Sequence, residues 1–350
     1  MIKIKFENLL VSIVVSVVVF FNTISTTMLE RNFFQVKVNF LFLVVLLLGL
    51  RFLYKMRVSY KYLILSILLL LSGVLVYFQT NRLNFLVYSM LLVLLVNVDM
   101  KVVLRNYVVV AGILVVGVFL LSLVGMVPNL QYNRAGVIRN SFGFIYPTDF
   151  ASHCFYLFLA ISYLLKDKFI WTRSLFGVLL SAFIIKYCDA RLNAVSILLA
   201  TVIFIYFYYS NGKKLKIFAL LPYSAVIFAS VVTYLSYKFS WSNPFLVSIN
   251  KLITGRLALG RNAFDTFGVH LFGTRNVQFI GSGGKTESVI GYNYVDSSYV
   301  QMLFTYGIVP VVILIIIYVV ASRKQYKDGQ YLLVAILSLI AFNCMIEAFW

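Results

Sequence analysis

The chain contains few of the residues on which water-soluble folds and secreted scaffolds depend. Only 12% of its 350 residues are charged, 11 are acidic, and it has three cysteines, five prolines and two histidines. A soluble globular domain carries about twice this share of charge, and a small secreted scaffold depends on many disulfides. The composition therefore excludes a water-soluble enzyme, a disordered chain and a disulfide-rich secreted protein.

Apolar residues make up 62% of the chain, about 217 positions. A membrane-spanning helix needs roughly 20 consecutive, mostly apolar residues, so the chain has enough for about eleven spans. We expect an all-α polytopic integral membrane bundle that forms a single domain over residues 1–350. The first apolar run is too long for a signal peptide, so we expect it to remain as a helix. The predicted spans are 9–25, 38–53, 62–78, 83–98, 107–124, 150–165, 175–187, 193–209, 217–237, 299–321 and 331–349.

The basic residues predict the orientation of these spans. Of the 30 Lys and Arg residues, 17 fall in one alternate set of short connections, and such a set faces the cytoplasm. The amino terminus is then cytoplasmic and, with eleven spans, the carboxy terminus is outside. Two long connections, about 125–149 and 238–298, lie on the external face, where a polar substrate would have room. The net charge of +19 thus reports orientation, and we expect no nucleic-acid partner.

Several arginines are predicted on this external face, against the usual charge bias. They are Arg134, Arg139, Arg191, Arg256, Arg261 and Arg275. An arginine near the bilayer core costs about 2.5–3.5 kcal/mol on insertion scales, and its planar fork binds phosphate bidentately. Such a group around one vestibule suits a lipid pyrophosphate. Alternatively each arginine lies among lipid headgroups or pairs locally, as Arg261 and Asp265 could at i and i+4.

The long external connection also contains a mildly amphipathic stretch, residues 249–264, with Ile249, Leu252 and Ile253 near one face. We predict one helix there that lies on the outer membrane interface. A helix that packs on the bundle is the alternative.

Aspartates begin several of the predicted helices. Asp296 stands at the external mouth of a span, where its carboxylate can accept a proton from a substrate, although N-capping of that helix is an alternative. For Asp149 and Asp189 we favour capping. His153 and His270 lack the neighbouring acids and cysteines of a metal site, so we expect no metal. No nucleotide-sugar site is recognisable, which favours a lipid-linked donor.

Four short stretches, in this order, resemble a known family. They are Arg139 with Gly143-Phe144, then Ala190-Arg191-Leu192-Asn193, then Gly255-Arg256 with Phe272-Gly273, and last Asp296-Ser297-Ser298 with Tyr306-Gly307. In these stretches the chain is similar to bacterial O-antigen and capsular (exo)polysaccharide polymerases of the Wzy type, within the O-antigen ligase-like group of membrane glycosyltransferases. The ligases often carry His-Asn where Asp296 stands, so Asp296 favours a polymerase.

The resemblance implies a multi-pass enzyme of the bacterial cytoplasmic membrane. Such enzymes join undecaprenyl-pyrophosphate-linked repeat units, and transfer the growing glycan to a sugar hydroxyl of the incoming, still lipid-linked unit. Partners would be these lipid-linked oligosaccharides, membrane lipids, a chain-length regulator and a flippase, with no metal and no cofactor. The implied catalytic residues are Asp296, Arg191 and Arg256, and the implied substrate-binding residues are Arg134, Arg139, Arg261, Arg275, Tyr146 and Tyr299.

Two other functions stay open on the sequence. The first is an enzyme of the same group that ligates glycan once to a different acceptor. The second is a transporter or flippase, which usually shows paired, Gly- or Pro-broken helices and binding groups at mid-membrane.

Overall fold

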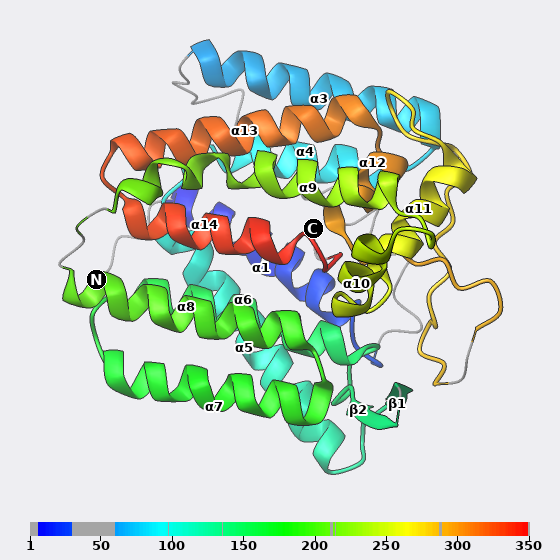
Figure 1. Cartoon of the computed structure of the whole chain (residues 1–350). Helices are drawn as coiled ribbons and strands as arrows, with labels where there is room; N and C mark the ends of the chain where they lie inside the picture. The colour runs from blue at the N-terminus through cyan, green and yellow to red at the C-terminus, as the bar shows by residue number, and fades with distance from the viewer. Residues whose placement is uncertain are drawn as a thin grey trace. The chain divides into compact units, whose positions relative to one another are not determined.

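The computed structural model of the chain describes residues 6–29, 60–96, 98–134, 136–210, 213, 215–286 and 289–348. The regular secondary structure of this part of the chain is helical apart from one short β-hairpin and an isolated bridge (Figure 1). Seven described helices are long and apolar enough to cross a membrane. The prediction of an all-α, multi-pass membrane protein is confirmed.

These seven helices correspond to the third and the fifth to tenth predicted spans. Shorter apolar helices, Leu9–Ile24, Asn84–Val93 and Tyr331–Asn343, stand at the first, fourth and eleventh. The second predicted span, 38–53, lies outside the described residues. Orientation in the bilayer remains a prediction.

The described chain divides into two compact units, and the single-domain prediction stays a prediction. Unit 1 comprises residues 1–60, 87–208 and 283–287, and unit 2 comprises 61–86, 209–282 and 288–350. Helix α4 (Asn84–Leu94) crosses the division.

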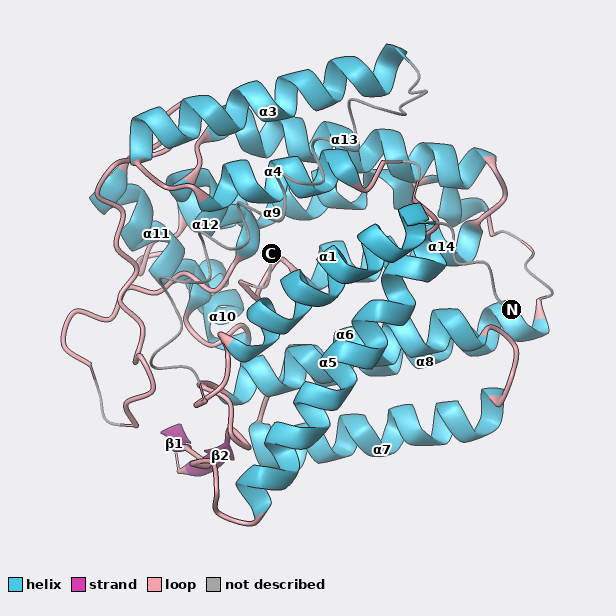
Figure 2. Cartoon of the chain, turned by 180° about the vertical axis from the view of Figure 1, so that it is seen from behind, coloured by secondary structure: helices cyan, strands magenta, loops and turns pink. Residues whose placement is uncertain are grey.

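Unit 1 is built on four helices that pack in a row: α1 packs on α5, α5 on α6, and α6 on α7. A hairpin of β1 and β2 closes one end of α7 (Figure 2). Its elements are α1 (Phe6–Ile24), α5 (Met100–Leu123), β1 (Gln131–Arg134), β2 (Val137–Asn140), α6 (Pro147–Leu165), α7 (Ile170–Cys188) and α8 (Arg191–Tyr209).

Helix α5 shows why these helices pack as they do. It begins where the Asp99 side chain accepts a hydrogen bond from the Lys101 N–H at 2.9 Å, the usual N-cap contact. Ala111, Val115 and Val118 recur at helical spacing and are buried, while the opposite face exposes apolar side chains such as Ile113. In a membrane protein that exposed apolar face meets lipid.

Gly177 sets the close approach of α7 to its neighbours. A Cβ there would lie 2.3 Å from Thr201 Oγ1 and 2.8 Å from a Phe158 ring carbon. A small residue is therefore required where these membrane helices meet.

Unit 2 is organised around α9, which packs against α11, α12, α13 and α14. Its elements are α3 (Tyr60–Thr80), η1 (Lys216–Ala219), η2 (Leu221–Tyr223), α9 (Ser224–Lys238), α10 (Pro244–Leu252), α11 (Arg256–Phe267), α12 (Ser298–Thr305), α13 (Ile308–Lys327) and α14 (Tyr331–Asn343).

The tenth predicted span, 299–321, is not one helix, and that detail of the prediction is wrong. The chain breaks at Gly307 between α12 and α13. Gly307 has φ +93°, and a Cβ there would lie 2.3 Å from Gly273 N, so only glycine fits. The preceding connection fills the break, because the Ile308 N–H donates to His270 O at 3.0 Å and Thr274 N–H donates to Phe304 O at 3.1 Å.

The amphipathic stretch 249–264 is also broken, so the single helix predicted there is wrong. Helix α10 ends at Leu252, and α11 begins at Arg256 after Gly255, whose φ of +88° marks the left-handed region. The residues between the two helices turn the chain, which leaves Arg256 in the first turn of α11. This break decides where the Arg256 side chain goes.

Candidate functional site

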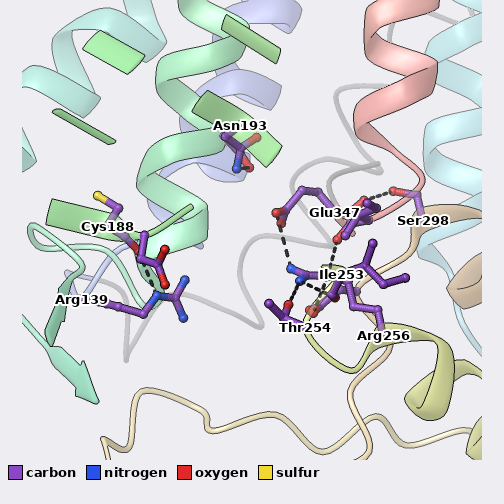
Figure 3. Close-up of polar contacts among 12 residues, drawn as sticks. Arg139, Cys188, Asn193, Ile253, Thr254, Arg256, Ser298 and Glu347 are labelled. Atoms are coloured by element: carbon purple, nitrogen blue, oxygen red, sulfur yellow. Dashed lines mark hydrogen bonds and ion pairs between the residues drawn. The ribbon is translucent and has the colours of Figure 1, made fainter. Parts of the chain in front are cut away.

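In unit 1, three of the predicted arginines gather at the carboxyl end of α7. Arg139 Nε donates to the Cys188 carbonyl at 2.9 Å (Figure 3), and Arg134 Nη2 donates to the Asp189 carbonyl at 3.0 Å. Asn140 Nδ2 reaches the Tyr187 carbonyl at 3.4 Å. The last carbonyls of a helix have no partner inside it and carry partial negative charge. The hairpin side chains supply these partners.

Asp189 joins the same group. Its carboxylate forms ion pairs with Arg134 and, at 2.9 Å, with Arg191 Nε, the first residue of α8. Both carboxylate oxygens thus go to arginines, so the predicted capping role of Asp189 is wrong. Capping is confirmed for Asp149, whose Oδ2 accepts from the Tyr146 N–H at 3.1 Å.

We call Arg134, Arg139, Asp189 and Arg191 the hairpin arginine cluster. Burial opposes the charge of Asp189, but hydrogen bonds from Arg134 and Arg191 outweigh it and hold the pKa of this carboxyl below its usual value. Three cations and one anion leave a net charge of +2. The Arg191 side chain is 66% exposed, so this surplus is accessible to an anion from outside the unit.

Tyr146 lies next to this cluster at the start of α6. Its hydroxyl accepts from the Gly283 N–H at 2.8 Å, and its ring stands 5.9 Å from that of Tyr132. Gly143, from the same predicted stretch, has φ +85°, and a Cβ there would lie 2.7 Å from Val118. The Gly143-Phe144 pair therefore holds this segment against α5.

In unit 2, Arg256 is the centre of a second cluster. Its Nε lies 3.2 Å from Asp296 Oδ2 and its Nη2 lies 3.6 Å from Glu347 Oε1. Its guanidinium also donates to the Ile346 carbonyl at 2.9 Å and to Thr254 (Figure 3). We call Arg256, Asp296 and Glu347 the Arg256 cluster. With one cation and two carboxylates it carries a net charge of −1, unlike the hairpin arginine cluster.

The three side chains of the Arg256 cluster differ in exposure. Arg256 is 15% exposed, Glu347 8% and Asp296 28%. Asp296 is thus the more solvent-accessible of the two carboxylates, and Arg256 is less exposed than Asp296. Asp296 precedes Ser297, the N-cap residue of α12. This arrangement suits Arg256 to orienting Asp296 rather than to binding a phosphate itself.

Asn250 positions Arg256. Its buried side-chain oxygen accepts from the N–H groups of Leu257 and Ala258 at 3.0 and 3.1 Å, and thereby caps the first turn of α11. The backbone turn between the two helices is closed by the Gly255 N–H, which donates to the Asn250 carbonyl at 2.8 Å.

The other predicted site residues of unit 2 lie elsewhere. Arg261 pairs with Asp265 at 2.8 Å, the local i,i+4 pair that was the alternative to phosphate binding. Arg275 is exposed in the connection between α11 and α12. Tyr299 is buried and its hydroxyl donates to the Ala341 carbonyl at 2.9 Å. That position places Tyr299 in the packing of the unit.

The sequence analysis missed Glu347 and Asn250. Glu347 could have been noticed as an acid within an apolar run, because ionisable groups in such segments usually have a partner. Asn250 carries no such signal, since an asparagine seven residues before a helical residue is not a recognised cap. Among the described residues, no group of three or more His, Cys, Asp or Glu side chains is arranged to hold a metal ion.

Comparison with models of known protein families, with curated proteins and with solved structures finds no match to this chain. The class that fold and composition define is therefore an all-α, multi-pass membrane protein. Within the described residues, a charged cluster lies at helix ends in each of the two units.

Proposed function

We propose that the protein is a polysaccharide polymerase, a membrane glycosyltransferase that uses polyprenyl-pyrophosphate-linked oligosaccharides. The observation that carries the proposal is the Arg256 cluster, in which a largely buried arginine holds the partly exposed carboxylate of Asp296 at 3.2 Å. The resemblance of the four sequence stretches supports the same function. The orientation we propose keeps the amino terminus in the cytoplasm of a bacterium and both clusters outside.

In the proposed reaction a sugar hydroxyl of the incoming unit attacks the anomeric carbon of the growing glycan. The new C–O bond forms as the bond from that carbon to the pyrophosphate oxygen breaks, and the electron pair leaves with the pyrophosphate. Asp296 accepts the hydroxyl proton, a role that typically contributes about 10²–10⁴-fold. Arg256 orients Asp296 through their ion pair.

A lipid diphosphate needs cations to bind, and unit 1, taken by itself, offers them in the hairpin arginine cluster. Its net charge is +2, and the Arg191 guanidinium is exposed. Arginine binds phosphate oxygens through paired N–H groups, and the loss of one such contact typically lowers the rate about 10²–10³-fold. Arg139 and Arg191 are the residues of unit 1 that we assign to the diphosphate of a lipid-linked substrate.

The test is elongation by the purified protein in proteoliposomes that contain a fluorescent lipid-linked repeat unit. Wild-type protein should produce a ladder of products, and Asp296→Asn should produce none while it inserts and purifies normally. Asp328→Asn, at an exposed aspartate after α13, is the matched control and should elongate as wild type does. Polymer from Asp296→Asn would remove Asp296 from the mechanism. A single transfer in place of a ladder would favour the ligase-like alternative.

One observation favours a transporter as the second candidate. The break between α12 and α13 resembles the discontinuous helices that line transporter binding sites. However, the break is filled by the chain itself, because His270 and Leu271 carbonyls accept from the first N–H groups of α13. An assay for movement of the labelled lipid across liposomes, without elongation, separates this candidate from the polymerase.

A further inference from the structure

Unit 1 contains an apolar groove that the clusters above do not use. It has a volume of about 560 Å³ and lies between α5, α6 and α7. Its lining includes Val116, Phe119, Phe150, Phe176 and Phe183, all apolar. Val116 and Phe176 are 55% and 54% exposed, so the groove opens on the surface that meets lipid.

Gly112 helps to keep this groove open. It lines the groove, and a Cβ at this position would find nothing within 4 Å. Glycine inside a helix is less favourable than alanine. Packing of the helices therefore does not require a glycine at position 112.

The two ends of the groove differ. At one end Arg173 is buried, and its Nη1 donates to the carbonyls of Ser162 and Lys166 at 3.0 and 2.7 Å. Its guanidinium also lies 5.0 Å from the Phe204 ring centroid. Arg173 thus serves the end of α6 and closes the groove.

The other end leads to the hairpin arginine cluster. Phe183 lines the groove, and the centroid of its ring lies 4.8 Å from that of Tyr187. The residue after Tyr187 is Cys188, whose carbonyl accepts the hydrogen bond from Arg139 Nε. Cys188 stands five positions after Phe183 in α7, about 7.5 Å along the helix axis. An apolar channel and a net positive charge therefore meet at the same end of α7.

We propose that the groove holds the polyprenyl chain of a polyprenyl diphosphate whose diphosphate binds Arg139 and Arg191. The charge at the open end matches the anionic headgroup, and the lining matches the hydrocarbon. Along α7 the lining runs from Arg173 to Phe183, about 15 Å, or half of the hydrocarbon thickness of a bilayer. The choice of a polyprenyl chain rests on the proposed function.

The experiment is photo-crosslinking of the full-length protein in nanodiscs with a diazirine-bearing undecaprenyl pyrophosphate analogue. Cross-links should map to peptides of α5, α6 and α7, and unlabelled undecaprenyl pyrophosphate should compete. Gly112→Leu should reduce labelling about tenfold because its side chain enters the groove. Gly117→Leu is the matched control, since a Cβ at Gly117 also meets nothing within 4 Å but the residue does not line the groove.

Two further variants are compared in the same cross-linking experiment. Val116→Trp fills the groove from a second position and should reduce labelling as well. Arg191→Ala should weaken labelling by the diphosphate probe but not by the corresponding polyprenol probe. Unchanged labelling of Gly112→Leu and Val116→Trp, or equal competition by phosphatidylglycerol, would overturn the proposal and identify the groove as a site of ordinary bilayer lipid.

Failure of this inference and failure of the proposed function are distinguishable. If the protein labels as described but never elongates glycans, the lipid site stands and the polymerase is wrong. If it elongates glycans and Gly112→Leu elongates and labels as wild type does, the polymerase stands and the groove is wrong.

Discussion

Removal of the Arg256 side chain tests the Arg256 cluster most directly. In Arg256→Ala, Glu347 loses its cation while its side chain stays 8% exposed. Breaking a buried ion pair from one side costs about 3–5 kcal/mol. We expect about 3 kcal/mol, the lower end, because the Nη2–Oε1 distance is 3.6 Å and Asp296 is more than a quarter exposed. This corresponds to roughly a hundredfold change in the unfolding equilibrium.

The second substitution makes this prediction specific. Arg256→Ala combined with Glu347→Gln should recover most of the lost stability, because a neutral amide needs no counter-charge. Elongation should stay absent in both variants, since Asp296 has lost the side chain that orients it. Arg261→Ala is the matched control on the same helix. Its pair with Asp265 is exposed, and exposed pairs contribute about 0.2–1 kcal/mol.

The assay is the free energy of unfolding, measured by SDS titration in mixed micelles, with elongation measured in parallel. A double variant as unstable as Arg256→Ala would refute the reasoning, because the loss would then not come from an uncompensated carboxylate. Full elongation by Arg256→Ala would remove its role in positioning Asp296.

Three further predictions follow from single contacts. Asp189 has a lowered pKa, so its stabilising contribution is complete above about pH 4 and is lost as the pH falls through that pKa. The thermal unfolding temperature of the wild-type protein should therefore fall in acid, and Asp189→Asn should lack this contribution to the fall. Gly307→Ala should prevent folding, as measured by recovery of monodisperse protein, because its Cβ would clash with backbone. Gly329→Ala, where φ is +73° but space is open, should cost only about 1 kcal/mol and serves as its control. Asn250→Ala should lower the free energy of unfolding by about 1 kcal/mol through the lost cap of α11. It should also reduce elongation in the same assay, because Arg256 is displaced. Elongation at the wild-type level would contradict this.

The sequence predicted the membrane bundle and the places of its helices because long apolar runs have few other solutions in a bilayer. It also offered the local pair of Arg261 with Asp265 as the alternative to phosphate binding, since residues at i and i+4 on a helix are neighbours whatever the rest of the chain does. The capping role of Asp149 was predictable for the same reason. All of these depend on residues close together along the chain.

The breaks in the helices were not predictable from apolar content alone. Residues 299–321 read as one apolar run, but Gly307 meets Gly273 so closely that the chain must turn there. The residue that imposes the break is 34 positions away in sequence. The β-hairpin between α5 and α6 was likewise not predictable as a cap of α7, because its side chains reach the carboxyl end of that helix only in the folded structure.

The sequence by itself determined the class of protein, because a chain so apolar must cross a membrane, and it determined how few charged residues are present to pair. Only the tertiary structure decided which charges meet. Asp189 pairs with Arg134, 55 residues earlier, and Arg256 pairs with Glu347, 91 residues later. Such partners are chosen by the packing of helices, and ion pairs of this kind leave no periodic trace in a sequence.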